Sequence, residues 1–384
     1  MLVPALVMFT TLGIALDYPT MSPKAYYIFD PEAVNTSLIQ IPTASTKSSY
    51  RLIKSSSETT DFLNVKGDIA VQAMYGKVAL QGFGKYLLQT INRRKTIELL
   101  CNVYHETLTE TFPSYIQQRE DWKLKKPEQV GTHYIKSIVY GGHLIISYKM
   151  IVERDEDLEE IKAAVDAQIQ DKGPLDANVA GNLEMIDKNF GSKHKVEINA
   201  YATAGVFNPP TNLEQVLRLI TEYPSLVKQI NNGKGAPVRI ELQPLTTLDP
   251  RFTQYKTASG LEAVLDSALN KLEDLKAADK DFKEWDADGL WDDDQQDMVN
   301  KYYKKLKDAL GSMIEAITSM DAPDGIGPDH FDKAFQFYGE GPENIPNKYV
   351  RELTKLIHDV EALRLLRFLW KCVQRKTSSR KINL

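Results

Sequence analysis

The chain has 384 residues, of which 42% are apolar and 26% are charged, a balance typical of a globular protein with a large core. Its formal net charge of −5 gives no broad basic field, which argues against nucleic acid as a partner. The two cysteines, Cys101 and Cys372, lie in distant segments, so neither a disulfide framework nor a CxxC metal site is expected.

The chain opens with an apolar segment, residues 1–17, that has the length of a secretory signal but not its other features. No Lys or Arg precedes the apolar run, and no clear small-x-small cleavage site follows it. Pro4 and Gly13 oppose a membrane-spanning helix, and the run is too short to span a bilayer. We therefore interpret it as a buried part of the fold. No run of about 18 apolar residues occurs elsewhere, so no constitutive transmembrane helix is expected.

A strand-like composition dominates the chain up to about residue 255. The Ser/Thr-rich residues 43–60 indicate an exposed loop or an irregular sheet edge. Strand-like segments follow, in chain order, at 65–106, 134–153, 194–204 and 236–245. One helix is predicted among them over 212–230, because its apolar residues have helical spacing and Asn212 can act as the N-cap.

The character of the sequence changes after residue 257. Three segments with apolar residues three and four positions apart predict helices over 259–285, 296–320 and 347–373. Strands followed by a block of helices indicate two domains, residues 1–255 and 256–384, of which the second is a small helical bundle.

Reactive groups that would mark an enzyme do not converge anywhere in the sequence. HETLT at 105–109 lacks the second His of a zinc-protease helix, GFGKY at 82–86 lacks the first glycine of a phosphate-binding loop, and no Gly-x-Ser-x-Gly elbow occurs. The acidic segment 284–295 resembles a calcium loop, but it has Gln295 where the bidentate Glu is needed. We interpret the first two as chance fragments and the third as a solvated loop. No catalytic residue, metal site or cofactor is therefore expected.

The charged segment 154–191 satisfies two templates at once. Its apolar residues recur three and four apart, as in helices, and they also alternate with polar residues around a good turn, DKGP at 171–174. A pair of amphipathic helices and a membrane β-hairpin with about 10 residues per strand are both open interpretations. In the hairpin, the lipid-facing residues would be Ile161, Ala163, Val165, Ala167, Ile169, Leu175, Ala177, Val179, Leu183 and Met185.

A weaker version of this double pattern occurs at 65–91, where the alternation changes phase after Gly76. Ala70, Met74 and Leu87 interrupt it, and a soluble amphipathic hairpin would explain it almost as well. The lipid-facing residues of this first hairpin would be Val65, Ile69, Val71, Ala73, Val78, Leu80, Tyr86 and Leu88.

The last 23 residues, 362–384, hold seven basic residues and no acidic one. Leu363, Leu366, Leu369 and Trp370 are interleaved with them. We favour a final bundle helix whose basic end suits the helix dipole. The alternative is contact with an anionic membrane surface.

The segment GTHYIKSIVYGG contains a spaced pattern of six residues. These residues are Gly131, Thr132, His133, Tyr134, Gly141 and Gly142. The pattern resembles the signature of the membrane-attack-complex/perforin (MACPF) superfamily, and it departs from that signature at Val130, where an aromatic residue is expected.

The order of the surrounding segments is similar to the stonustoxin/neoverrucotoxin type of that superfamily. Residues 4–17, 76–87 and 235–249 resemble the opening, the first hairpin region and the close of its pore-forming domain. A focal-adhesion-targeting-like helical bundle follows in that group, as the predicted helices do here. The thioredoxin-like and lectin-like C-terminal domains of the fish toxins are not matched, which leaves pairing mode and target recognition open.

The resemblance implies an α+β fold with a bent, twisted four-stranded antiparallel sheet, flanked by two helical clusters and followed by the helical bundle. It also implies that the clusters open on oligomerisation into two amphipathic hairpins of a large β-barrel. The segments 65–91 and 154–191 lie where these clusters are expected. The implied partners are a membrane lipid or receptor and further copies of the chain or a related subunit. The implied location is soluble, either extracellular or stored in the cytoplasm, before conversion to a membrane-bound form.

Within this resemblance, Gly141 and Gly142 would allow the central strand to bend and later to straighten, because glycine tolerates conformations that other residues resist. A simple bulge or a close backbone contact is the alternative. The expected function is that of a perforin-like cytolysin without catalytic chemistry. A non-lytic binding or assembly protein with the same fold is the chief alternative, and a hydrolase has almost no supporting residues.

Overall fold

The computed structural model describes residues 2–5, 11–18, 21–75, 82–89, 95–152, 155–168, 177–191, 193–205, 207–252, 260–286, 289, 291–321, 326–339 and 347–380. The chain forms two compact units. The first consists of residues 1–89, 95–269 and 317–330, and the second of residues 90–94, 270–316 and 331–384. The predicted boundary near 255 stays a prediction, because residues 253–259 lie outside the described residues.

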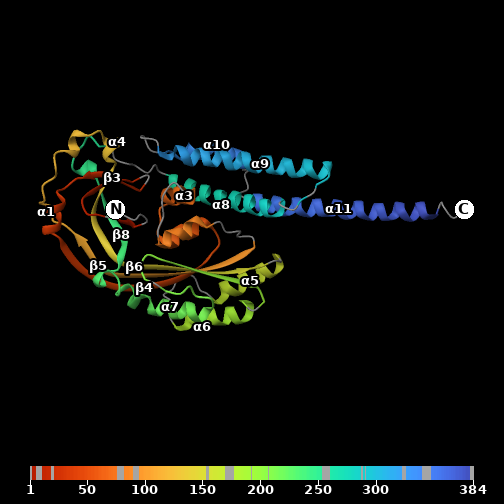
Figure 1. Cartoon of the computed structure of the whole chain (residues 1–384), viewed down its shortest axis with the longest axis horizontal. Helices are drawn as coiled ribbons and strands as arrows, with labels where there is room; N and C mark the ends of the chain where they lie inside the picture. Colours follow the sequence, from red (N-terminus) through yellow and green to blue (C-terminus); the bar gives the residue numbers. More distant parts are fainter. Residues whose placement is uncertain are drawn as a thin grey trace. The chain divides into compact units, whose positions relative to one another are not determined.

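An antiparallel sheet is the framework of the first unit, and its long strands curve along their length (Figure 1). The strands are β1 (Leu2–Pro4), β2 (Ile14–Asp17), β3 (Ser22–Tyr27), β4 (Ile39–Ile53), β5 (Thr96–Thr111), β6 (His133–Ile151), β7 (Lys195–Ala202) and β8 (Ala236–Pro244). β5 lies between β4 and β6, and β6 also pairs with β7 over residues 144–151 and with β8 over residues 133–141. The expected four-stranded antiparallel sheet is confirmed as β4–β5–β6–β7, and β8 with the short N-terminal strands enlarges it.

Three helices cover one face of this sheet: α5 (Asp155–Gln168), α6 (Ala177–Ile186) and α7 (Leu213–Val227) (Figure 1). Every second residue of β6 from Leu144 to Met150, followed by Val152, joins the apolar side chains of these helices in one buried cluster. This alternation is what a strand with a buried face requires, because successive side chains point to opposite sides of a sheet.

A second helical cluster covers the opposite face. It consists of α2 (Ser56–Leu63), α3 (Gly67–Tyr75) and the 3₁₀ helix η1 (Gly82–Leu88). Just after η1, Gln89 Oε1 accepts a hydrogen bond from Lys149 Nζ at 2.5 Å, and the ring of Tyr86 lies 5.9 Å from that of Tyr201. Lys149 and Tyr201 belong to the alternate set of strand residues, so the two predicted clusters flank the sheet as expected.

Two expectations for the region before β5 are wrong in part. Residues 43–60 are not a loop, because β4 runs to Ile53 and α2 begins at Ser56. The edge interpretation is right: the outer part of β4 is largely exposed, and Ser and Thr side chains suit such a strand. Of the described residues within 65–106, those from Thr96 onward form the strand β5, and α3 and η1 precede them. Before these residues, α2 is capped by Ser55, whose Oγ accepts a hydrogen bond from Glu58 N at 3.2 Å.

Other expectations for the first unit are confirmed. In the N-terminal segment, the described residues Val3, Leu12 and Leu16 are buried, so this segment is part of the fold. α7 begins as predicted, because Asn212 Oδ1 accepts a hydrogen bond from Gln215 N at 2.9 Å. The short helices are α1 (Pro31–Thr36), α4 (Pro127–Val130), η2 (Trp122–Leu124), the π-helix η3 (Asp187–Gly191), η4 (Asn231–Gly233), η5 (Leu245–Thr247), η6 (Ser319–Asp321) and η7 (Pro328–Phe331).

The second unit is helical, as predicted. Its helices are α8 (Leu261–Asp286), which begins in the first unit, α9 (Asp293–Thr318), α10 (Asp332–Tyr338) and α11 (Lys348–Arg380). The buried carboxylate of Asp274 on α8 accepts hydrogen bonds from the backbone N–H groups of Tyr349 and Val350 at 2.8 and 3.1 Å. It therefore caps the first turn of α11 from a different helix, which fixes how the two helices meet. Over the described residues, none of the helices is both long enough and apolar enough to cross a bilayer.

Candidate functional site

The first half of the 131–142 motif ties the start of β6 to β2. Gly131 has a φ of +96°, and a Cβ atom there would lie 2.9 Å from the carbonyl of Leu16, so the position requires glycine. Thr132 N donates a hydrogen bond to Leu16 O at 3.1 Å, and Thr132 Oγ1 accepts one from Tyr18 N at 2.9 Å. The glycine and the threonine therefore act together as an anchor for the N-terminal strands.

The two aromatic rings of the motif pack against the same region. His133 is buried, with Nδ1 2.9 Å from Thr132 Oγ1 and its ring 5.4 Å from the ring of Tyr18. Tyr134 meets Phe29 edge to face at 5.3 Å between ring centroids. Both side chains take part in aromatic packing in this structure.

Gly141 and Gly142 lie in the middle of β6, where the ladder to β5 shifts register between Glu106 and Leu108. A Cβ atom on Gly141 would overlap the carbonyl oxygen of His105, and one on Gly142 would overlap Val227 of α7. The close-contact alternative is thus confirmed by the geometry, since any side chain here would displace β5 or α7. The hinge role stays a prediction.

The loop after α7 is fastened over the same point. Lys234 Nζ forms an ion pair with Glu110 at 2.5 Å, and Thr107 Oγ1 lies 2.5 Å from Lys234 O and 3.1 Å from Tyr140 O. Burial tends to raise the pKa of Glu110, but hydrogen bonds led by that of Lys234 outweigh it and hold the pKa below its usual value. The bend of β6 is therefore covered by α7 and also by the Lys234–Glu110 ion pair, which we call the latch.

Two buried histidines stand on β6 near the ends of the motif. Burial, with a smaller effect of the Lys66 cation, lowers the pKa of His133 to about 4. Burial, with a smaller effect of Arg239, lowers the pKa of His143 to about 3, and its Nε2 lies 2.6 Å from Asn102 Oδ1. Both rings are consequently neutral in the folded protein at pH 7.

Acidification is expected to destabilise the first unit through these two rings. The unfolded chain binds their protons near pH 6.5, whereas the folded chain resists them down to about pH 3–4, so stability is lost as the pH falls from about 6.5. We expect the free energy of unfolding, measured with urea, to be about 2–4 kcal/mol lower at pH 5 than at pH 7.5. His143→Gln, which keeps a neutral hydrogen-bonding group, should recover about half of this loss. Equal stability at the two pH values would contradict the assignment.

The predicted residues of the first hairpin segment lie in the cluster formed by α2, α3 and η1. Val65, Ile69, Val71, Ala73 and Tyr86 are buried in it. Val78 and Leu80 lie outside the described residues, and Leu88 lies in η1. Their packing is that of a helical cluster on the sheet.

The second segment also adopts its helical interpretation. Ile161, Val165 and Leu183 are buried against the sheet, while Ala163, Ala167 and the 48% exposed Met185 point away from it. Ile169 and Leu175 lie outside the described residues, and Ala177 and Val179 lie in α6. The spacing of three and four decides which side chains are buried here, whereas the period of two has no role in this state.

A contact that sequence reasoning missed holds the first cluster in place. A Cβ atom built on Gly67, the first residue of α3, would lie 3.1 Å from Cβ of Leu265 on α8. Both residues belong to the first unit, and Leu265 is buried. Glycine at the start of a helix lets the two helices approach closely, but no local pattern in the sequence identifies its neighbour.

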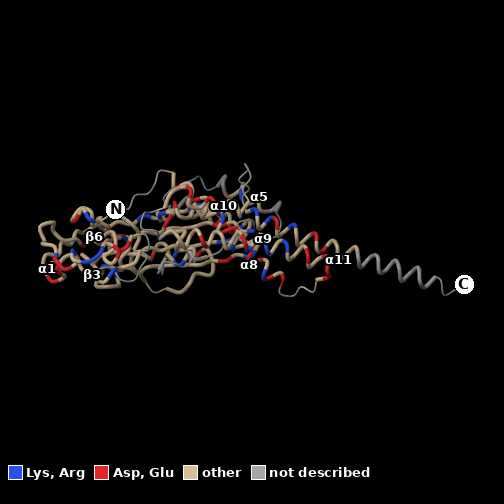
Figure 2. Tube along the Cα trace, turned by 90° about the horizontal axis from the view of Figure 1, so that it is seen from above, with Lys and Arg blue, Asp and Glu red and all other residues tan. Residues whose placement is uncertain are grey.

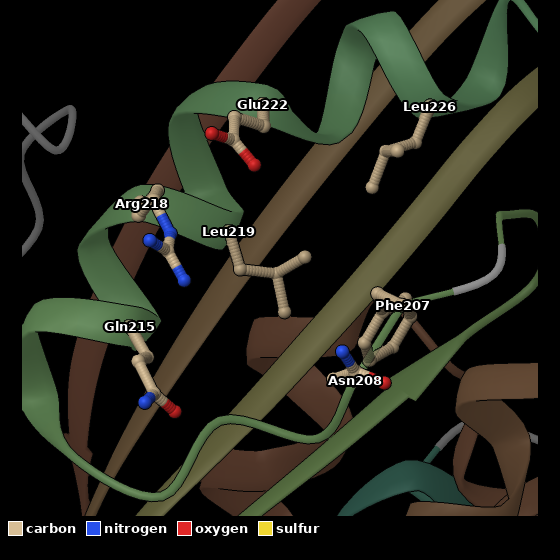
Figure 3. A pocket seen from close by; sticks show the side chains of 7 residues that line it. All are labelled: Phe207, Asn208, Gln215, Arg218, Leu219, Glu222 and Leu226. Carbon is tan, nitrogen blue, oxygen red and sulfur yellow. The ribbon is translucent and has the colours of Figure 1, made fainter.

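A surface pocket of 290 Å³ lies between α7 and the segment that follows β7 (Figure 3). Phe207, Leu219 and Leu226 form its apolar part, and Arg218 and Glu222 stand one turn apart on α7. Asn208 and Gln215 complete the lining. The pocket holds no pair of groups with the geometry of a nucleophile and its base, and it does not include the 131–142 motif.

Metal and redox chemistry find no support among the described residues. They contain no group of three His, Cys, Asp or Glu side chains that could hold a metal ion. In the acidic segment after α8, Asp286 Oδ1 accepts a hydrogen bond from Trp291 Nε1 at 2.8 Å, which employs one of the carboxylates of the supposed calcium loop. Burial raises the pKa of the Cys101 thiol to about 12, so that thiol is unreactive.

Comparison with known proteins gives a structural answer and no sequence answer. No family profile and no curated protein sequence matches the chain. Stonustoxin matches with a TM-score of 0.50 and 13% identity, over 95% of this chain and 47% of that one. The chain thus spans about half the length of the stonustoxin chain.

Two further solved structures match less closely. One is a putative cell invasion protein with a MAC/Perforin domain from Bacteroides thetaiotaomicron (11% identity, TM-score 0.34, 67% of this chain and 59% of that one), and the other is wild-type pneumolysin (15%, 0.29, 54% and 41%). From the likeness to stonustoxin and the geometry of the sheet, the chain has the fold shared by perforin-like (MACPF) proteins and cholesterol-dependent cytolysins.

Proposed function

We propose that the chain is a pore-forming protein that oligomerises on membranes and inserts two β-hairpins per subunit. The hairpins would form from the residues between β4 and β5 and from those between β6 and β7. Its partners would be a membrane lipid or receptor and further copies of the chain or a related subunit. It would be released as a soluble protein and become membrane-bound on assembly.

The connectivity of the sheet supports this proposal. Each helical cluster joins two strands that are already paired and antiparallel: the β4–β5 ladder ends at Ile53 opposite Glu98, and the β6–β7 ladder ends at Ile151 opposite Lys195. If a cluster opens, its chain can continue both strands of its ladder without crossing any other strand. A long hairpin needs no change of topology.

The register of these ladders is the strongest support for the proposal. Continued residue by residue from Ile151 and Lys195, the β6–β7 ladder sets Ile161 opposite Met185 and Ala167 opposite Val179, and it places the turn at Gly173. Gly173 belongs to the segment DKGP, which the sequence predicts to be a turn. Strand pairing and turn chemistry thus agree.

The register of the β4–β5 ladder gives the same agreement for the first hairpin segment. Continued from Ile53 and Glu98, the β4–β5 ladder sets Val65 opposite Tyr86 and Ala73 opposite Val78. Its turn falls next to Gly76, where the alternation of apolar residues changes phase. A phase change at a turn is what two strands sharing one apolar face require.

All four apolar stripes also reach the same face of the extended sheet. Glu98 pairs with both Ile53 and Lys149, and Lys149 pairs with Glu197, so these four residues share one face. Counting every second residue from each of these four positions into the adjoining hairpin segment reaches one of the four sets of residues predicted to face lipid. A one-residue slip in any ladder would turn its stripe to the other face. A common face is what a barrel wall with one lipid side and one water side needs.

Assembly must accompany insertion. A single hairpin in lipid would leave unpaired backbone N–H and C=O groups, each costing several kcal/mol, and a closed ring of subunits removes such edges. The outer edge of β4 is largely exposed in this chain. It is therefore open to pairing with another copy.

Dye release from liposomes tests the proposal with two matched variants. Ala163 and Glu160 are both exposed on α5, but Ala163 belongs to the lipid-facing stripe and Glu160 to the opposite face of the hairpin. A lysine on the lipid face costs about 2–4 kcal/mol per subunit near the bilayer centre, so Ala163→Lys should cut the rate of release at least about tenfold. Glu160→Lys should leave it within about twofold.

Equal losses in the two variants would sink the hairpin assignment. The non-lytic alternative makes a different prediction, since a binding or assembly protein with this fold would associate with membranes without leakage. Wild-type protein that binds vesicles of several lipid compositions and releases no dye from any of them would establish that alternative.

A further inference from the structure

The burial of the described side chains changes along the helix α11. Its first half is packed into the second unit through the buried residues Tyr349, Val350, Leu353, Leu356 and Val360. Beyond Val360 the described side chains are mostly exposed, and the large apolar residues Leu365 and Leu366 are exposed by 63% and 62%. The helix itself continues to Arg380. Among the described side chains of α11, Val360 is therefore the last buried one.

The charges of α11 change at the same place. Acidic and basic residues are mixed along α8, α9 and the first half of α11 (Figure 2). From Ala362 to the end of the chain there is no acidic residue, and seven basic residues occur. Such a one-sided segment has no internal means of neutralising its charge.

The basic residues of the second half have helical spacing. Arg364, Arg367, Lys371 and Arg375 follow one another at three and four positions, a spacing that makes one stripe along an α-helix. Up to Val373, the residues at the remaining positions around this stripe are apolar: Leu363, Leu365, Leu366, Phe368, Leu369, Trp370, Cys372 and Val373. A narrow basic stripe beside a wide apolar arc with Trp, Phe and Leu is typical of helices that lie in a membrane interface.

We propose that α11 beyond Val360 is a docking helix for an anionic lipid surface. The basic stripe would meet the headgroups, and Leu365 and Leu366 with the apolar residues that follow would enter the acyl boundary. A second copy of the helix is a poor occupant, because the two basic segments would repel one another. A spanning orientation is also poor, because basic residues at regular intervals would be drawn into the hydrocarbon.

This docking is separate from pore formation. It would concentrate the chain on a membrane whether or not hairpins are inserted, and vesicle binding measures it without any leakage. Its failure and the failure of the pore proposal are therefore distinguishable. The bundle-helix interpretation of residues 362–384 remains the alternative to this proposal.

Co-sedimentation of the full chain with vesicles tests the docking helix. Binding should be at least about tenfold tighter to phosphatidylcholine vesicles containing 30% phosphatidylserine than to pure phosphatidylcholine, and it should weaken as salt is raised. Reversal of three charges, Arg367→Glu with Lys371→Glu and Arg375→Glu, should reduce binding to the anionic vesicles at least about tenfold. These positions leave the contact of the Arg364 guanidinium with the Trp291 ring intact.

A control on the same helix distinguishes binding through this local surface from binding through the overall charge of the protein. Arg351 and Lys355 are exposed on the packed half of α11, and the pair Arg351→Glu with Lys355→Glu should change binding by less than about twofold. A second variant, Leu365→Ser with Leu366→Ser, should weaken binding at every salt concentration. Equal effects of the two charge reversals, or no binding to anionic vesicles at all, would overturn the proposal, and the latter would leave an acidic protein as the partner of this surface.

Discussion

Oxidation of a Gly67→Cys, Leu265→Cys variant is expected to abolish dye release from liposomes, and a reductant is expected to restore it. A Cβ atom at position 67 would lie 3.1 Å from Cβ of Leu265, close to the separation of about 3.5–4.5 Å found in disulfides. The bond would staple α3, which belongs to the first hairpin segment, to α8. Because a hairpin cannot form while one of its residues is held on α8, release should fall by about two orders of magnitude or more.

The controls follow from the cysteines of the chain. Cys372→Ser removes the native thiol nearest the C-terminus, while Cys101 is buried and can stay. The variants Gly67→Cys and Leu265→Cys, each made alone in the Cys372→Ser background, should release dye at the same rate before and after oxidation. If the oxidised double variant leaks as fast as the reduced one, α3 does not leave α8, and the first hairpin would have to be withdrawn from the proposal.

Local sequence patterns predict part of this fold well. The glycines of the motif mark a closely packed point of β6, although the atoms they meet on β5 and α7 are far away in the sequence. Asn212 marks the start of α7, because a helix cap is a short-range requirement. The same locality explains the error at 43–60. Ser and Thr suit both a loop and an exposed edge strand, and only the ladder to β5 decides between them.

The segments 65–91 and 154–191, which fit both a helix and a strand pattern, show what a sequence leaves undecided. Their apolar residues fit periods of both 2 and 3.6, and Ala fits either, so packing in a given state makes the choice. In this structure the sheet selects the helical period: Ile161 and Val165 are buried, and Ala163 and Ala167 between them are exposed. The alternation that has no role here is the part that the extended ladder register would use.

Long-range contacts at the site could not have been derived from the sequence. The close approach of Gly67 to Leu265 and the pairing of Lys234 with Glu110 each join residues more than a hundred positions apart. Such contacts depend on how elements are stacked, and one sequence contains no record of that stacking. The glycine and the charges are visible in the sequence, but their partners are not.

The resting state is stabilised at the point where it would have to change. α7 and the Lys234–Glu110 latch lie over Gly141 and Gly142, and a side chain on either glycine would meet β5 or α7. Straightening β6 would require α7 to move off Gly142, which the two glycines permit because they add no side chain to either arrangement. Close contact in the bent state and a hinge role are thus compatible.

The ladder register makes the most discriminating prediction for the inserted state. In a Cys372→Ser background, the pair Ala167→Cys with Val179→Cys should form a disulfide in membrane-bound protein, because the continued β6–β7 register sets these positions opposite one another. The pair Ala167→Cys with Ala180→Cys should cross-link at least about tenfold less, because residue 180 points to the other face of a strand. If α6 stayed helical on the membrane, residues 179 and 180 would be neighbours on one helix, and a tenfold difference between their cross-linking yields would not be expected. Gel mobility after mild oxidation of vesicle-bound protein measures both yields. Equal yields would mean that this segment stays helical on the membrane, whereas a preference for 180 would place the second hairpin one residue out of the predicted register.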